Sequence, residues 1–185
     1  MSKIVGVLSV QGDFREHLET LAELDCDPRA VKTAEAIAAC DALIIPGGES
    51  TTIGKLCDRF ELDVPIKALH ARGAPIWGTC AGMILLARNI VDCDQWRLGL
   101  MDITVERNAF GRQVDSFEAD LDVAAIEGGP VRAVFIRAPF VREVDESAGV
   151  EVLARVGGKI VMCRQGHLLA TAFHPELTED RRVQQ

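Results

Sequence analysis

A cysteine between two glycines is the residue of this sequence best suited to covalent chemistry. It lies in the Gly-Thr-Cys-Ala-Gly segment at 78–82, directly after an apolar run at 74–77. The glycines permit a tight, strained turn between a strand and a helix, which pushes the middle side chain into a cleft. N–H groups at the start of the following helix favour a thiolate over a thiol. The segment therefore predicts that Cys80 is a nucleophile for a carbonyl carbon.

A thiol nucleophile needs a base and a group that orients the base, and a His-Pro-Glu segment supplies both. His174 follows an apolar run at 168–173, and Glu176 comes two residues later. Residues two apart in an extended segment point to the same side, and Pro175 favours extended backbone at His174. Taken alone, the segment fits a buried strand-end histidine beside a surface glutamate equally well. Beside the cysteine turn it predicts a Cys80–His174–Glu176 triad.

The other three histidines are expected to have no catalytic role. His17 is expected on a solvated or interface face of a helix, His70 on a helix surface, and His167 in a turn between two strands.

Two segments are candidates for the N–H donors that stabilise a developing oxyanion. One donor is the N–H of Ala81, directly after the nucleophile, and the other is Gly48 in the Pro-Gly-Gly-Glu-Ser loop at 46–50. This loop leaves a parallel strand at its carboxyl end, where open α/β sheets build their sites. An ordinary turn is the simpler explanation of a lone glycine pair. The ordinary-turn explanation is weaker here because the loop and the cysteine turn follow neighbouring predicted strands.

Two arginine-bearing segments are candidates for holding a substrate carboxylate. Two arginines flank a turn at 106–113, and Arg137 ends an apolar strand. An arginine can grip a carboxylate with two parallel hydrogen bonds. On chemistry alone, a surface arginine paired with an acidic neighbour is the simpler interpretation of each. No cluster of His, Asp and Glu has ligand spacing in the sequence, so no metal is expected.

The composition fits one compact domain spanning 1–185, because 185 residues with 48% hydrophobic content can bury a sizeable core. The net charge of −8 argues against nucleic-acid binding. No apolar stretch is long enough to cross a bilayer. The sequence begins directly on a strand pattern, so we expect no targeting peptide and a cytoplasmic location. The six cysteines lack Cys-x-x-Cys spacing, and no disulfide scaffold is expected.

Strand and helix patterns alternate in the first half of the sequence and predict an α/β fold, a parallel sheet with helices on both faces. The expected strands there are 3–10, 29–32, 42–46 and 75–79, and the expected helices are 13–24, 33–39, 51–59, 65–71 and 80–88. The second half favours a mixed sheet or an antiparallel extension, with strands at 100–106, 117–123, 131–136, 150–156, 159–164 and 167–173 and a hairpin at 156–160. A short last helix is expected at 176–183.

Seven segments from one end of the chain to the other resemble the class I, triad-type glutamine amidotransferases, and more narrowly the glutaminase subunits of pyridoxal 5'-phosphate synthase. They are GVLSVQG at 6–12, PGGESTT at 46–52, GTCAG at 78–82, LGLMD at 98–102, ERNAFGRQ at 106–113, FIRAP at 135–139 and FHPEL at 173–177. The cysteine turn alone identifies only the broad class, whereas PGGESTT and ERNAFGRQ are far more specific. The resemblance implies a three-layer, flavodoxin-like fold with a mostly parallel central sheet and an antiparallel extension.

The resemblance also implies an activity, which is hydrolysis of L-glutamine to L-glutamate and ammonia through a cysteinyl thioester. The ammonia would pass to a synthase subunit in a large hetero-oligomer that makes pyridoxal 5'-phosphate, a product and not a bound cofactor. Cys80 would be the nucleophile, His174 the acid and base, and Glu176 its orienting group. The glutamine-binding residues it implies are Gly48, Glu49, Ser50, Arg107, Ile136 and Arg137. The glycine-pair peptide, near Gln11, would adjust when the synthase docks, which suggests low activity alone.

Three other functions stay open on the sequence. The first is an amidase or peptidase of the related cysteine-elbow superfamily, which often has histidine where Ala81 stands. The second is an amidotransferase subunit for another acceptor, and many of those have glutamine where Ile84 stands. The third is a binding module without activity, against which the intact triad argues.

Overall fold

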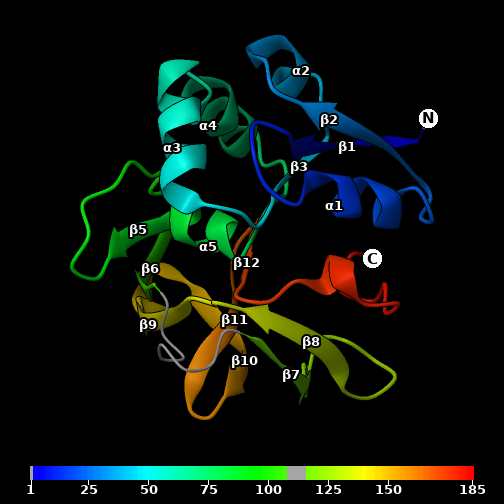
Figure 1. Ribbon diagram of the computed structural model, residues 1–185, viewed down its shortest axis with the longest axis vertical. Helices are drawn as coiled ribbons and strands as arrows, with labels where there is room; N and C mark the ends of the chain where they lie inside the picture. The colour runs from blue at the N-terminus through cyan, green and yellow to red at the C-terminus, as the bar shows by residue number, and fades with distance from the viewer. Residues whose placement is uncertain (1, 108–115) are drawn as a thin grey trace.

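The computed structural model describes residues 2–107 and 116–185, which form helices packed on one large sheet beside a smaller one (Figure 1). The strands are β1 (Lys3–Leu8), β2 (Cys26–Val31), β3 (Ala42–Ile45), β4 (Ile76–Thr79), β5 (Ala87–Ile90), β6 (Met101–Glu106), β7 (Ser116–Leu121), β8 (Val131–Ile136), β9 (Phe140–Val144), β10 (Val150–Val156), β11 (Lys159–Gln165) and β12 (Leu168–Thr171). The helices are α1 (Phe14–Leu21), α2 (Ala34–Ala38), α3 (Ser50–Arg59), α4 (Asp63–Ala71) and α5 (Ala81–Leu86), with 3₁₀ turns η1 (Glu146–Ala148) and η2 (Pro175–Leu177).

The large sheet has a parallel half and a mostly antiparallel half. Strands β2, β1, β3, β4 and β12 lie side by side in that order, and every neighbouring pair is parallel. The sheet continues through β11, β9 and β6, with antiparallel pairing at each step, to β5, which is parallel to β6. Strand β10 pairs with β11 as the expected hairpin, and β7 pairs with β8 in the small sheet. The predicted mixed α/β architecture is confirmed.

Helices cover both faces of the parallel half, because its strands alternate two sets of apolar side chains. In β3, Leu43 and Ile45 pack into the core that α2 to α5 cover. Ile44 faces the other way, into a smaller core with Trp77 and with Leu21 of α1. Figure 1 shows α1 on one side of these strands and α3, α4 and α5 on the other. The layers are thus helix, sheet and helix.

The carboxyl ends of β1, β3, β4 and β12 meet at one edge because all four strands are parallel. The segments that follow them begin at Ser9, Pro46, Cys80 and Ala172. The Asp13 N–H in the first segment donates to the Gly47 carbonyl in the second, at 3.1 Å. This edge of the sheet therefore gathers four of the segments that resemble the amidotransferases.

Several expected boundaries are wrong. Helix α5 ends at Leu86, and β5 follows where the helix was expected to reach residue 88, because Ala87 is extended and pairs with β6. Strand β9 was not foreseen. The expected last helix at 176–183 is absent from the described chain, which has only η2 there and then extends at Thr178. Strand β2 begins at Cys26 and includes a proline, which an edge strand tolerates.

No helix within residues 2–107 and 116–185 is long and apolar enough to cross a membrane.

Candidate active site

Cys80 occupies the sharp turn between β4 and α5 with φ 48° and ψ −102°, a conformation that non-glycine residues rarely adopt. The flanking glycines have a different role from the cysteine. A Cβ on Gly82 would lie 2.0 Å from the Ile45 carbonyl oxygen, and a Cβ on Gly78 would lie 2.5 Å from the Gly82 backbone. Gly78 and Gly82 are therefore needed because a side chain at either position would clash with nearby backbone. The strained backbone conformation belongs to Cys80 itself.

The structure brings the three predicted triad residues together. His174 follows β12, and its backbone N–H donates to the Val134 carbonyl at 2.8 Å. Its ring Nδ1 lies 2.7 Å from Glu176 Oε1, and the Cys80 side chain is close enough to act on the same ring. His174 and Glu176 are 3% and 6% exposed. Since Nδ1 faces the glutamate, Nε2 is the ring nitrogen that faces the thiol.

The electrostatics of the site favour the charged form of the His174 imidazole. Burial lowers the pKa of His174, but hydrogen bonds and charges from Cys80 and Glu176 outweigh burial and raise that pKa to about 10. An imidazole with such a pKa is protonated at neutral pH and can give up a proton. The arrangement places a thiol and a potential proton donor next to each other.

His17 does not lie on a solvated face, and that expectation is wrong. Its side chain on α1 is fully buried, with Nε2 3.2 Å from Thr79 Oγ1 and 3.4 Å from Glu176 Oε2. Burial lowers the pKa of this imidazole. The helical spacing indicated that His17 would be buried, because it lies with Phe14, Leu18 and Leu21 on one helical face at i, i+3, i+4 and i+7. By contrast His70 is partly exposed on α4, and His167 is exposed in the expected turn between β11 and β12.

The Gly47–Gly48 loop lies against both the imidazole and the segment after β1. A Cβ on Gly47 would lie 2.4 Å from His174 Cε1, and one on Gly48 would lie 2.8 Å from Gly12 Cα. Gly48 also has φ +144°, which only glycine adopts readily. The following N–H, of Glu49, donates to Gln11 Oε1 at 2.9 Å. Gln11 thus lies beside this loop.

Two of the expected glutamine-binding residues bond to one glutamine side chain that the sequence did not single out, and a third pairs with one of the two. Arg107 Nη1 donates to Gln95 Oε1 at 2.9 Å, and the Ser50 hydroxyl donates to the same oxygen at 3.3 Å. Arg107 Nη2 lies 3.6 Å from Glu49 Oε1. Gln95 was missed because it lies in the irregular segment after β5, outside any motif.

Ile136, the last residue of β8, lies close to Cys80, and Arg137 follows it in the chain. The Ile136 carbonyl oxygen is 4.0 Å from Cys80 Sγ, and Arg137 has the unusual φ of 42°. The other arginine of the ERNAFGRQ segment, Arg112, lies outside the described residues. Ala81, expected as an oxyanion donor, is the buried first residue of α5.

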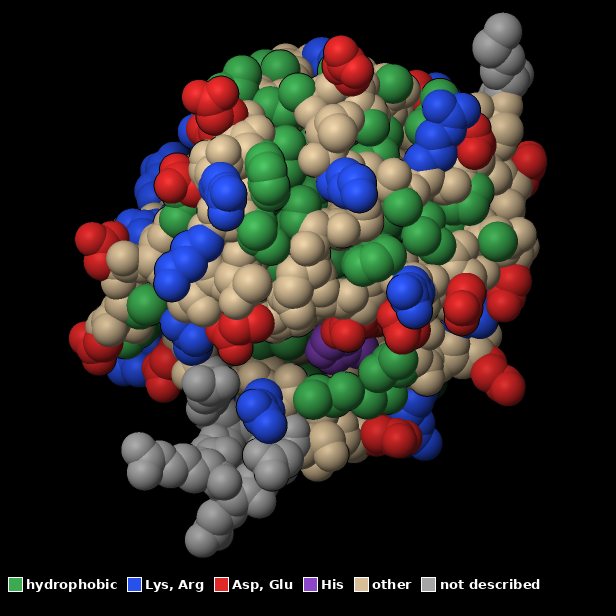
Figure 2. All heavy atoms as spheres, turned by 45° about the horizontal axis from the view of Figure 1, so that its top comes forward, with side chains coloured by type: hydrophobic (Ala, Val, Ile, Leu, Met, Phe, Trp, Pro, Cys, Tyr) green, Lys and Arg blue, Asp and Glu red, His purple; other side chains and the backbone are tan. Residues whose placement is uncertain are grey.

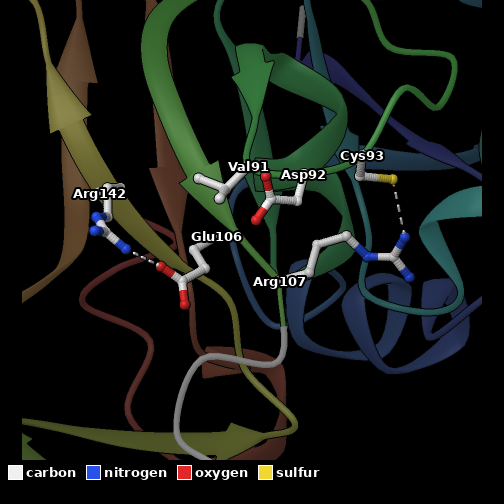
Figure 3. Close-up of a pocket in the computed structure, with 6 residues that line it drawn as sticks. All are labelled: Val91, Asp92, Cys93, Glu106, Arg107 and Arg142. Atoms are coloured by element: carbon white, nitrogen blue, oxygen red, sulfur yellow. Dashed lines mark hydrogen bonds and ion pairs between the residues drawn. The ribbon is translucent and has the colours of Figure 1, made fainter.

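A cavity of about 530 Å³ adjoins Arg107 and is lined by Val91, Asp92, Cys93, Glu106, Arg107 and Arg142 (Figure 3). Arg142 is paired with Glu106 at 2.6 Å, while Arg107 turns away from that pair toward Cys93 Sγ, at 3.5 Å. None of the triad residues lines this cavity. The space-filling view shows histidine atoms in a recess across the middle of one face, with charged side chains along its rim (Figure 2).

One group of the described residues has ligand atoms close enough to surround a metal ion. These atoms, from Asp13, His174 and Glu176, lie within 4.8 Å of one another. Two of the three residues belong to the triad, and the nitrogen that faces the carboxylates is the one bonded to Glu176 at 2.7 Å. The triad interpretation accounts for the same contacts.

Comparisons with known sequences identify relatives of this chain. A model of the SNO glutamine amidotransferase family matches residues 7–185. A Pelotomaculum thermopropionicum protein named pyridoxal 5'-phosphate synthase subunit PdxT is 59% identical over 179 residues, covering 97% of this chain and 90% of that protein. A protein of the same name from Acidothermus cellulolyticus is 56% identical over 186 residues, covering 97% and 89%.

Solved structures show the same similarity. A crystal structure of a glutamine amidotransferase superposes with a TM-score of 0.91 at 51% identity, covering 97% of this chain and 94% of the other. PurLQS from Thermotoga maritima superposes with a TM-score of 0.72 at 19% identity, covering 95% and 89%. The second likeness concerns the fold alone.

Proposed function

The chain belongs to the SNO glutamine amidotransferase family, and from that premise we propose that it is the glutaminase subunit of a pyridoxal 5'-phosphate synthase. One domain spanning 1–185 hydrolyses L-glutamine to L-glutamate and ammonia. The observation that supports this most is the contact of His174 with both Cys80 and Glu176, the latter at 2.7 Å.

The reaction begins when the Cys80 thiolate attacks the carboxamide carbon of glutamine. His174, protonated at Nε2, gives its proton to the leaving nitrogen, so that ammonia departs and a glutamyl thioester remains on Cys80. The neutral imidazole then takes a proton from water, which attacks the thioester and releases glutamate. The 2.7 Å contact with Glu176 orients the ring and stabilises its charged form in both steps.

Two backbone N–H groups are proposed to stabilise the oxyanion of each tetrahedral intermediate. Ala81 follows the nucleophile, and its N–H, at the first turn of α5, lacks an intrahelical acceptor. Gly48 is the second donor. The Gly47 carbonyl is bound by the Asp13 N–H, so the Gly48 N–H, opposite it in the trans peptide, points away from the segment after β1. Strand β4, which ends at the nucleophile, lies on that other side.

The remaining predicted residues are proposed to bind the amino-acid end of glutamine. Arg107 and Arg137 supply guanidinium groups for the α-carboxylate, and Glu49 supplies a carboxylate for the α-ammonium. Ser50 and the Ile136 carbonyl supply further polar contacts, the latter 4.0 Å from Cys80 Sγ. Groups fixed at both ends of the substrate select glutamine over the shorter asparagine.

The partner in this proposal is a synthase subunit, which receives the ammonia inside a large hetero-oligomer. The relatives named pyridoxal 5'-phosphate synthase subunit support this partner. The position of Gln11 beside the Gly47–Gly48 loop supports the expectation that docking adjusts this loop. The cytoplasmic location stays a prediction.

The test is an assay of glutamate and ammonia release by the full chain, alone and with the synthase subunit. We expect little release alone, release with the synthase, and no release by Cys80→Ala, whose circular dichroism should match the wild type. Full activity without the synthase would favour a free amidase. No release by the wild-type complex would mean a binding module, and would contradict the proposal.

A further inference from the structure

We infer that His17 is a positioning residue of the triad, a neutral imidazole that holds the Glu176 carboxylate against His174. The inference rests on the proposed glutaminase function and adds to it a residue that lies behind the three catalytic groups. His17 does not touch the reacting atoms, and it acts through Glu176.

The two oxygens of Glu176 face two different imidazoles. Oε1 bonds to His174 Nδ1 at 2.7 Å, and Oε2 lies 3.4 Å from His17 Nε2. Both Oε2 and the whole His17 side chain are buried, and Oε2 has no hydrogen-bond partner among the described residues. A buried carboxylate oxygen without a donor is costly, so the imidazole nitrogen that faces it has a clear role.

The tautomer follows from the partners of each ring nitrogen. A carboxylate oxygen can only accept, so the proton belongs on His17 Nε2, the nitrogen that faces Glu176 Oε2 and Thr79 Oγ1. The other nitrogen, Nδ1, is buried and has no hydrogen-bond partner within residues 2–107 and 116–185. A proton there would leave a donor unsatisfied and would turn the Nε2 lone pair toward the carboxylate. Burial keeps the ring neutral, because it lowers the pKa of His17.

The contacts around His17 fix the ring in place. It meets Trp77 edge-on, with ring centroids 5.9 Å apart and an interplanar angle of 78°. Its Nε2 lies 3.2 Å from the hydroxyl of Thr79, the residue directly before the nucleophile. One imidazole therefore links α1, the end of β4 and the carboxylate of the triad.

A second carboxylate explains why positioning matters. Asp13 Oδ2 lies 3.7 Å from His174 Nδ1, and the Asp13 side chain is 45% exposed. A mobile Glu176 would leave His174 to pair with this solvated carboxylate, which would turn the ring and weaken its contact with Cys80. His17 restrains Glu176 and so keeps the buried carboxylate as the partner.

The test compares two amides that differ in reach. In His17→Gln the side-chain nitrogen can take the place of Nε2, whereas in His17→Asn it reaches only the place of Nδ1. His17→Leu removes both nitrogens. Leu21→Val, on the same helix and in the same core, is the packing control. Each variant is assayed for glutamine hydrolysis as the complex with the synthase.

We expect kcat to fall about tenfold in His17→Leu and His17→Asn, with KM within about twofold of the wild type. His17→Gln should recover most of kcat, and Leu21→Val should keep it. Equal kcat for the Gln and Asn variants would overturn the inference, as would wild-type kcat in His17→Leu. The Gln–Asn comparison decides the matter even if the Leu variant fails to fold.

A second readout separates this inference from the proposed function. The rate at which iodoacetamide alkylates Cys80, followed by mass spectrometry of its peptide, reports the thiolate without glutamine turnover. At neutral pH it should fall about tenfold in His17→Asn and stay near wild type in His17→Gln. If the wild-type complex releases no ammonia, the proposed function fails. Equal alkylation rates in His17→Asn and His17→Gln would contradict the role of His17, whatever the outcome for ammonia release.

Discussion

At the scale of single residues, two histidines contact one glutamate yet have pKa values that move in opposite directions. Burial lowers the pKa of His17. Burial acts on His174 in the same sense, but contacts with Cys80 and Glu176 raise its pKa to about 10. One ring is thus kept neutral and the other charged within one buried cluster. The neutral ring of His17 suits a positioning residue, and the charged ring of His174 suits a proton donor.

The pH dependence of stability should show the charged ring. The pKa of His174 is raised from 6.5 to about 10, so its contribution to stability is fully present below about pH 6.5 and is lost as pH rises toward 10. We expect the free energy of unfolding, from urea titrations, to fall more steeply between about pH 7 and 10 in the wild type than in His174→Gln. Parallel curves for the two proteins would contradict this assignment.

Arg107 makes a second prediction for single residues. Replacing Arg107 by Ala removes a guanidinium that contacts Glu49 and Gln95. We expect KM for glutamine to rise about tenfold or more, because charge-assisted hydrogen bonds to the substrate carboxylate are lost, with little change in kcat. Arg142→Ala, which lines the same cavity but pairs with Glu106, is the matched control. An unchanged KM in Arg107→Ala would rule out the clamp.

The sequence predicted that Cys80, His174 and Glu176 would lie together, but it did not predict which residues surround them. Cys80 and His174 stand in short segments whose chemistry depends on neighbours in sequence, which spacing rules describe. His17, Asp13 and Gln95 act through neighbours brought close only by folding. For His17 the helical stripe indicated burial, but nothing in the spacing indicated Glu176 as its neighbour.

At the scale of helices and strands, four parallel strands place the site. The segments after β1, β3, β4 and β12 lie at one edge, and close contacts there leave room only for glycine at 47 and 82. The nucleophile turn therefore depends on its packing against β3 as much as on its own conformation.

The packing of the turn gives a prediction about stability. In Gly82→Ala the new Cβ would lie 2.0 Å from the Ile45 carbonyl oxygen, so we expect a loss of about 2 kcal/mol or more in the free energy of unfolding. Gly158→Ala is the control, since its φ of +80° strains an alanine but nothing lies within 4 Å of the added Cβ. Its loss should be about 1–2 kcal/mol. A loss in Gly82→Ala no greater than in the control, measured by urea unfolding, would refute the packing argument.

Sequence periodicity predicted the parallel half better than the rest. Strands such as β3 and β4 are continuous apolar runs buried on both faces, which the pattern makes plain. Strand β5 is short and follows α5 directly, and only its pairing with β6 defines it. The tail lacks its expected helix because long-range contacts hold it, with Arg181 on Glu23 and Arg182 on the Glu127 and Gly129 carbonyls.

At the scale of the whole molecule, the two halves of the chain supply different parts of the site. The first half provides Cys80, Gly48 and the segment with Asp13, while β6 and β8 of the second half lead to Arg107 and Ile136. The second half also returns through β12 to bring His174 beside the nucleophile. The proposed chemistry therefore requires the complete fold, because no single segment contains nucleophile, base and substrate contacts.

The most direct measurement of the central claim uses a glutamine analogue that has an electrophilic carbon in place of the carboxamide. The chain, in complex with the synthase, is treated with this analogue and the modified peptide is identified by mass spectrometry. We expect one equivalent to attach to Cys80, in parallel with the loss of glutamine hydrolysis and with protection by glutamine. Loss of activity with Cys80 unmodified, or with the label on another residue, would contradict the account.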